Sequence, residues 1–168
     1  IVKRNGEISQ TLKSDSLNKL KNRGPDGKKS VLITKNGYQI FVGFTRLSIM
    51  DTSENAIQPY IDNENNCVVC NGEIYNYREL KFKYGLKTDT KCDCEVILPL
   101  LSITSFENMI RDELDAEFAM IYYSKSQSKI YFARDRYGVR PLYIGYNDNM
   151  IMISSELKVL NGNVDNIS

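Results

Sequence analysis

The order of apolar and polar residues predicts strands, a short helix and tight turns in the first half of the chain. Strands are predicted over residues 30–34 and 38–43, because two mainly apolar runs flank Asn36-Gly37, a dipeptide typical of hairpin turns. An amphipathic helix is predicted over residues 14–22, with Ser14 as its cap. The proline and glycines of residues 23–27 end that helix.

The second half changes from strand to helix and back to strand. A buried strand over residues 67–70 leads into Asn71-Gly72, where we expect a turn, and a short helix follows over residues 78–84. A further helix begins over residues 95–101 around Pro99, and its apolar face continues to Leu114. Four later strands, over residues 118–123, 129–134, 141–146 and 150–154, are predicted to form a β-meander. This order predicts an α+β layered fold in a single domain over residues 1–168.

Composition narrows the classes of function. The 22 Lys and Arg residues nearly balance the 21 Asp and Glu residues, so charge gives no argument for a nucleic-acid or membrane partner. No apolar run reaches the length of a bilayer span and no signal-type leader is visible, so we expect a cytoplasmic protein. The chain has no histidine, which removes Ser-His-Asp and Cys-His catalysis and histidine-ligated metals together.

The four cysteines allow two interpretations. Their spacing, Cys67-x-x-Cys70 and Cys92-x-Cys94, is compatible with a zinc site of four thiolates. On one strand, however, Cys67 and Cys70 would point to opposite faces, and one metal could not bind both. We therefore expect no metal, and thiols that pack as small hydrophobic side chains.

Two other segments carry candidate chemistry. The main-chain N–H of Gly72 and the side-chain amide of Asn71 are adjacent donors, which suits a developing oxyanion. The same dipeptide is also typical of a plain hairpin turn, although the helical spacing of Ile74, Tyr75 and Leu80 favours a helix after it. Arg46 interrupts an apolar run, as either a surface side chain or a group that binds an anion.

Seven motifs occur in one order, and together they resemble the glutamine-hydrolysing domain of asparagine synthetase. This domain is a class II glutamine amidotransferase with the N-terminal-nucleophile fold. The motifs are Arg23-Gly24-Pro25-Asp26-Gly27, Arg46-Leu47-Ser48-Ile49, Gln58-Pro59, Asn71-Gly72-Glu73-Ile74-Tyr75-Asn76, Cys92-Asp93-Cys94-Glu95-Val96-Ile97, Ala133-Arg134-Asp135-x-x-Gly138-x-x-Pro141-Leu142-Tyr143 and Ser154-Ser155-Glu156-Leu157-Lys158.

The resemblance implies a four-layer αββα sandwich that binds L-glutamine and hydrolyses its side-chain amide. By the resemblance, Arg46 holds the glutamine α-carboxylate and Asp93 its α-ammonium group. Asn71 and Gly72 form the oxyanion hole. Leu47, Ile49 and Glu73 complete the pocket around the amino-acid end of the substrate. The site implied by the resemblance uses no cofactor, and ATP and Mg²⁺ are expected only if a synthetase domain is present elsewhere.

The chain departs from the family pattern in four ways. The family nucleophile is an N-terminal cysteine whose own α-amino group acts as base, and this cysteine is expected shortly ahead of Ile1 but is not in the sequence. Gly-His-x-Arg-Leu is here Gly43-Phe44-Thr45-Arg46-Leu47, and Asp-Gly-x-Phe-Ala is here residues 115–119 with Ala116 in place of glycine. The synthetase domain and its nucleotide loop are absent from these residues.

These departures leave alternatives open. On one interpretation, the chain is an active glutaminase domain whose leading cysteine is missing from the given sequence. On a second, it is a fragment of a synthetase and passes ammonia to a synthetase domain or subunit, with or without homodimer formation. Alternatively, it is an inactive homologue with a structural, scaffold or protein-interaction role.

Overall fold

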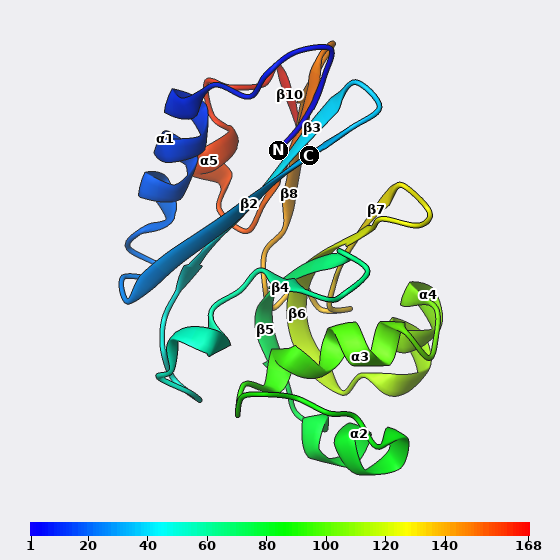
Figure 1. Cartoon of the computed structure of the whole chain (residues 1–168). Coiled ribbons are helices and arrows are strands. Elements are labelled where there is room, and N and C mark those ends of the chain that lie inside the picture. Colours follow the sequence, from blue (N-terminus) through cyan, green and yellow to red (C-terminus); the bar gives the residue numbers. More distant parts are fainter. The chain divides into compact units, whose positions relative to one another are not determined.

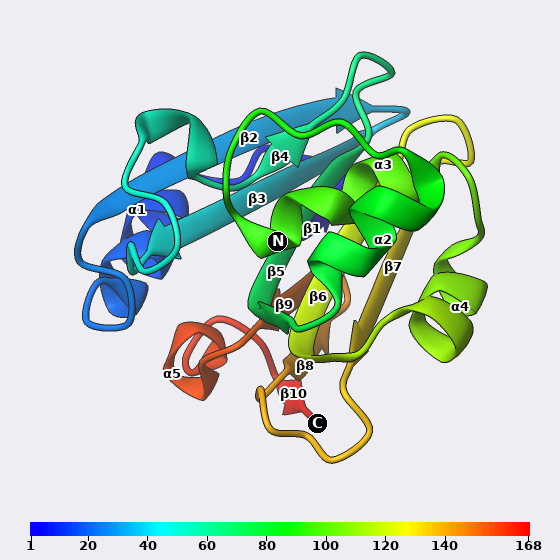
Figure 2. The ribbon, with the colours of Figure 1, turned by 90° about the horizontal axis from the view of Figure 1, so that it is seen from below.

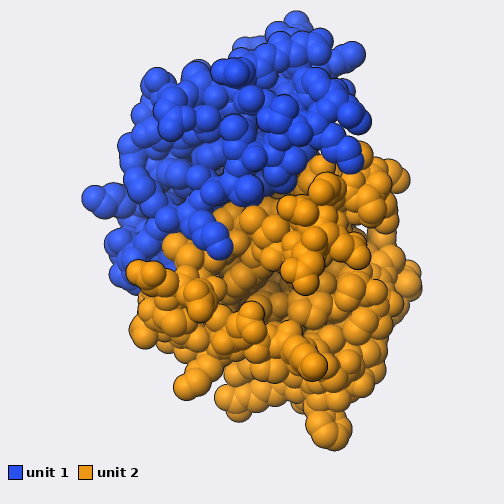
Figure 3. Space-filling model, in the orientation of Figure 1, with its two compact units in different colours: residues 1–47, 141–168 blue, residues 48–140 orange.

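The computed structural model of the protein describes all of residues 1–168, and the chain divides into two compact units (Figure 3). The first unit comprises residues 1–47 and 141–168, and the second comprises residues 48–140. Each unit contains one antiparallel sheet with its own helices. None of the helices has the length and apolar character that a bilayer span requires.

The first unit is built on a six-stranded antiparallel sheet, in the strand order β10-β8-β9-β1-β3-β2. Helix α1 packs beside α5 and against β3, and α5 packs against β8 and β9 (Figure 1). Met152, Val159 and Leu160 form the buried centre of this packing. The elements are β1 (Val2–Arg4), α1 (Gln10–Leu20), β2 (Gly27–Lys35), β3 (Tyr38–Arg46), β8 (Tyr143–Asn147), β9 (Met150–Ser154), α5 (Leu157–Leu160) and β10 (Asn166–Ile167).

Local sequence explains much of this unit. The predicted hairpin is confirmed, since Asn36 and Gly37 take φ values of 51° and 80° between β2 and β3. The predicted start of the first helix is wrong. Ser9, and not Ser14, is the cap, because its hydroxyl accepts the Leu12 N–H at 3.1 Å and α1 begins at Gln10.

The second unit contains a four-stranded antiparallel sheet, in the strand order β4-β5-β6-β7. Helices α2 and α3 lie over β5 and β6 (Figure 2). The buried centre includes Val68, Met120, Leu80 and Leu100. The elements are η1 (Glu54–Ala56), β4 (Tyr60–Ile61), β5 (Cys67–Ile74), α2 (Tyr77–Tyr84), η2 (Asp93–Val96), α3 (Ile97–Leu101), α4 (Phe106–Asn108), η3 (Met109–Glu113), β6 (Ala116–Ser124) and β7 (Lys129–Arg134).

Two predictions for the second half need correction. The helix predicted to continue to Leu114 is broken after Leu101, and Ser105 caps the new start by accepting the Asn108 N–H at 3.2 Å. The predicted meander is two hairpins, because β6 and β7 belong to one sheet whereas β8 and β9 belong to the other. Alternation within a strand does not specify which sheet the strand joins.

Helix α2 allows a direct test of its packing. Leu80 is 2% exposed and Phe82 is 93% exposed on the same helix. We expect Leu80→Ala to lower the free energy of unfolding by about 2–5 kcal/mol, because it leaves a cavity in the core. Phe82→Ala, the matched control, should change it by less than about 0.5 kcal/mol. Urea unfolding of both variants measures this difference, and equal losses would contradict the packing described.

Candidate active site

The Asn71-Gly72 dipeptide lies inside strand β5, so the predicted turn is wrong. Asn71 is paired with Ala119 and Gly72 with Phe118 on β6. Gly72 does not have a positive φ, so its backbone conformation does not require glycine. The requirement for glycine at this position is steric. A Cβ atom at Gly72 would lie 2.1 Å from the Glu117 carbonyl oxygen and 2.7 Å from the Phe118 Cα. Glycine here allows β5 and β6 to approach closely.

The Gly72 N–H faces the open edge of β5. In an antiparallel pair, alternate residues direct their N–H groups toward the partner strand. Tyr75 donates to the Asp115 carbonyl at 2.8 Å on the β6 side, and therefore Gly72, an odd number of residues away, points to the other side. Strand β4 pairs only with Cys67 and Val68 on that side, so no strand covers Gly72.

Gln58 occupies the same edge beside Gly72. Its side-chain oxygen accepts the Cys70 N–H at 2.6 Å, and its side-chain nitrogen donates to the Cys70 carbonyl at 3.0 Å. The buried amide thereby replaces a paired strand at that position. This contact could not be inferred from the Gln58-Pro59 motif, because it joins a side chain to the backbone of a distant segment.

Asp93 lies on the other side of Gly72 along this edge. It begins η2, is 5% exposed, and its carboxylate accepts the Ile74 N–H at 2.6 Å. The thiol of Cys94 lies 3.7 Å from the same carboxylate and 3.7 Å from the Gly72 carbonyl oxygen. The structure therefore brings together two predicted site residues that are far apart in sequence.

The cysteines are packing groups in this structure. All four are free; Cys67, Cys70 and Cys94 are buried, and Cys92 is half-buried. Hydrogen bonding to Cys70, together with burial, raises the pKa of Cys94 well above its ordinary value. A protonated, buried thiol is a poor nucleophile. Cys70 is 2% exposed within the core cluster, so it cannot substitute for the family nucleophile.

Glu73 has a neighbour that sequence analysis did not identify. Glu117 lies directly across from Glu73 on β6, and a residue pair of this kind places both side chains on one face of the sheet. Arg140 forms an ion pair with Glu117 and balances one of the two carboxylates. Asp135 holds the turn before Arg140 by accepting the N–H groups of Tyr137 and Val139, each at 3.0 Å.

The backbone of Arg46, a predicted site residue of the first unit, is held by the 23–27 turn. Arg46 ends β3, pairs with Gly27, and accepts the Asp26 N–H at 3.0 Å. A Cβ atom at Gly24 would lie 2.5 Å from the Arg46 nitrogen, so only glycine allows this approach. The exposed Leu47 follows, and Ile49, in the second unit, is 78% exposed.

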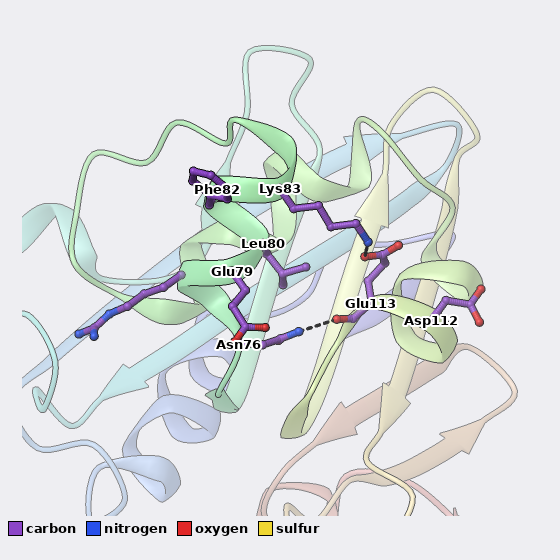
Figure 4. Close-up of a pocket in the computed structure, with 8 residues that line it drawn as sticks. Asn76, Glu79, Leu80, Phe82, Lys83, Asp112 and Glu113 are labelled. Atoms are coloured by element: carbon purple, nitrogen blue, oxygen red, sulfur yellow. Dashed lines mark hydrogen bonds and ion pairs between the residues drawn. The ribbon is translucent and has the colours of Figure 1, made fainter.

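The second unit also contains a pocket of about 600 Å³ (Figure 4). It lies between α2 and η3, where Lys83 forms an ion pair with Glu113 at 2.8 Å. The Asn76 amide donates to the Glu113 carbonyl at 2.8 Å. The pocket is lined by none of the predicted substrate residues; its lining consists of Asn76, Arg78, Glu79, Leu80, Phe82, Lys83, Asp112 and Glu113.

Comparison with known proteins places the chain in a family. Residues 2–167 match the family model described as a glutamine amidotransferase domain. A solved structure of the glutamine phosphoribosylpyrophosphate amidotransferase from Bacillus subtilis superposes with a TM-score of 0.75 at 19% identity, covering 95% of this chain and 42% of that chain. This likeness confirms the predicted fold class, the N-terminal-nucleophile hydrolase type. The chain belongs to the glutamine amidotransferase domain family.

Within that family, the chain is homologous to the glutaminase domains of asparagine synthetases. It is 52% identical over 146 residues to a probable glutamine-hydrolysing asparagine synthetase of Acanthamoeba polyphaga mimivirus, covering 86% of this chain and 26% of the relative. It is 33% identical over 144 residues to asparagine synthetase B of Escherichia coli, covering 84% of this chain and 25% of that protein. The chain thus spans about a quarter of the length of these relatives.

Proposed function

We propose that the protein hydrolyses the side-chain amide of L-glutamine to glutamate and ammonia. The observation that carries this proposal is the edge of β5, where the Gly72 N–H faces outward beside the buried Asp93 carboxylate. A donor for an oxyanion and an acceptor for an ammonium group are the two recognition elements that glutamine hydrolysis needs at opposite ends of the substrate.

The chemistry follows the family pattern. A cysteine thiolate attacks the glutamine amide carbon, and the oxyanion that forms accepts hydrogen bonds from the Gly72 N–H and the Asn71 amide. The carbon–nitrogen bond breaks with proton transfer to the leaving ammonia, and water then cleaves the thioester to glutamate. The α-amino group of the same cysteine acts as base, which suits a chain without histidine.

The register between β1 and β3 supports the proposed position of the nucleophilic cysteine. Ile1 exchanges hydrogen bonds with Phe41, so two residues joined ahead of Ile1 would continue β1 alongside Val42 and Gly43. Strand β3 then runs from Gly43 to Arg46, the proposed carboxylate ligand. A cysteine on that extension would therefore lie on the strand that pairs with β3, the strand that carries Arg46.

The ammonia acceptor belongs to the proposal as well. Because the relatives are asparagine synthetases, we infer that ammonia passes to a synthetase domain or subunit that makes asparagine. The glutaminase step uses thiol, amine and N–H groups and needs no cofactor. ATP and Mg²⁺ would serve only the synthetase reaction.

Covalent labelling tests the proposal. We expect a diazoketone analogue of glutamine to add once to the native protein, on its N-terminal cysteine, and excess glutamine to prevent the addition. Intact mass and N-terminal sequencing of the labelled protein identify the site. An N-terminus without cysteine and no adduct would reject the proposal and favour the inactive homologue.

A further inference from the structure

Asp51 joins two segments that carry predicted substrate residues. One oxygen of its carboxylate accepts the Ser53 N–H at 2.7 Å, within the segment that follows Ile49. The other oxygen accepts the Lys91 N–H at 2.9 Å, in the segment that leads to Asp93. Nothing in the proposed chemistry uses Asp51, yet its side chain connects both parts of the substrate pocket within the second unit.

The Lys91 segment is itself held in place by Glu95. The Glu95 carboxylate accepts the N–H groups of Asp89 and Thr90 at 2.8 Å and 2.9 Å. The Thr90 hydroxyl also donates to Glu95 and accepts the Cys92 N–H at 3.1 Å. These bonds fix the backbone on both sides of Lys91, so the Lys91 N–H has a defined direction toward Asp51.

We propose that Asp51 is a positioning residue for glutamine, which sets the Ile49 segment relative to Asp93; this inference rests on the proposed function. The Ser53 and Lys91 N–H groups donate to different oxygens of Asp51, and a carboxylate supplies an acceptor at both positions. An asparagine supplies one oxygen, and its NH₂ group would face the second N–H. The segments that bind the amino-acid end of glutamine would then separate.

The test compares Asp51→Asn with Asp62→Asn in the full protein. Asp62 is a matched control, because one of its oxygens accepts the N–H groups of Glu64 and Asn66 at 3.0 Å and 2.8 Å in the turn before β5. That turn precedes Cys67, the residue at the end of β5 farthest from Gly72. Glutamate release gives KM and kcat, and calorimetry gives the Kd for glutamine.

For Asp51→Asn we expect KM to rise about tenfold with kcat within about twofold, since uniform loss of substrate binding raises KM alone. Asp62→Asn should leave both parameters unchanged. An unchanged KM in Asp51→Asn, a fall in kcat alone, or an equal rise of KM in Asp62→Asn would overturn the inference.

The outcome also separates this inference from the proposed function. If the wild-type protein releases no glutamate, the proposed function fails, and calorimetry then decides the role of Asp51. A weaker Kd in Asp51→Asn only would support positioning, whereas no binding or an equal Kd would overturn it.

Discussion

Gly72→Ala should lower the free energy of unfolding by about 3 kcal/mol or more and abolish glutamate release. The new Cβ atom would meet the Glu117 carbonyl oxygen at 2.1 Å, and this oxygen belongs to the backbone of β6, which cannot rotate away. Strands β5 and β6 must therefore separate at this position. The Gly72 N–H would move with β5 and leave the proposed oxyanion hole.

Gly162→Ala provides the control for this prediction. Gly162 has a φ of 78°, and a Cβ atom there meets nothing within 4 Å. Its replacement should cost only the backbone strain of a left-handed residue, about 1–2 kcal/mol. Chemical unfolding of both variants measures the two losses. A Gly72→Ala protein as stable as Gly162→Ala would contradict the close approach of β5 and β6.

Asp93→Asn should lower kcat/KM for glutamine by a factor of about 10²–10³, which is the usual effect of removing one partner of a buried charge pair. The asparagine oxygen can still accept the Ile74 N–H, which Asp93 now accepts at 2.6 Å. The fold should therefore persist. The negative charge that we propose to bind the glutamine α-ammonium group would be absent.

Steady-state glutamate release measures this effect, with Asp115→Asn as the control. Asp115 is exposed, and its backbone makes its contacts here: its carbonyl accepts the Tyr75 N–H and its N–H donates to the Asn76 side chain. The control should keep its kcat/KM within about twofold. An Asp93→Asn protein with wild-type kcat/KM would show that Asp93 does not bind the substrate ammonium group.

Sequence patterns predicted those elements whose cause is local. The β2–β3 hairpin follows from Asn36-Gly37, and α2 ends where Gly85 takes a φ of 60°. The strand through Asn71-Gly72 was not predicted, since its cause is the close approach of β6. The assignment of β8 and β9 to a second sheet was also missed, because pairing over a long sequence distance leaves no local pattern.

The candidate site also contains residues that the sequence predicted and residues that only the structure revealed. The order of the motifs predicted Asn71, Gly72 and Asp93 as site residues. In the structure, the Asp93 carboxylate accepts the Ile74 N–H on β5, the strand that carries Gly72, and the neighbouring Cys94 thiol lies beside the Gly72 carbonyl oxygen. The roles of Gln58, Glu117 and Asp51 depend on bonds between a side chain and a distant backbone or strand. Such contacts have no signal in the residue order, and they were found only from the structure.

Release of glutamate and ammonia by the native protein is the direct test of the proposed glutamine hydrolysis. We expect equal amounts of both products from glutamine, and a rate about 10²-fold lower in Asn71→Ala, which lacks one proposed donor to the oxyanion. Asn71→Ala should retain the wild-type unfolding curve, since Asn71 is paired to β6 through its backbone. No release by the native protein, or equal rates in the two proteins, would contradict the account.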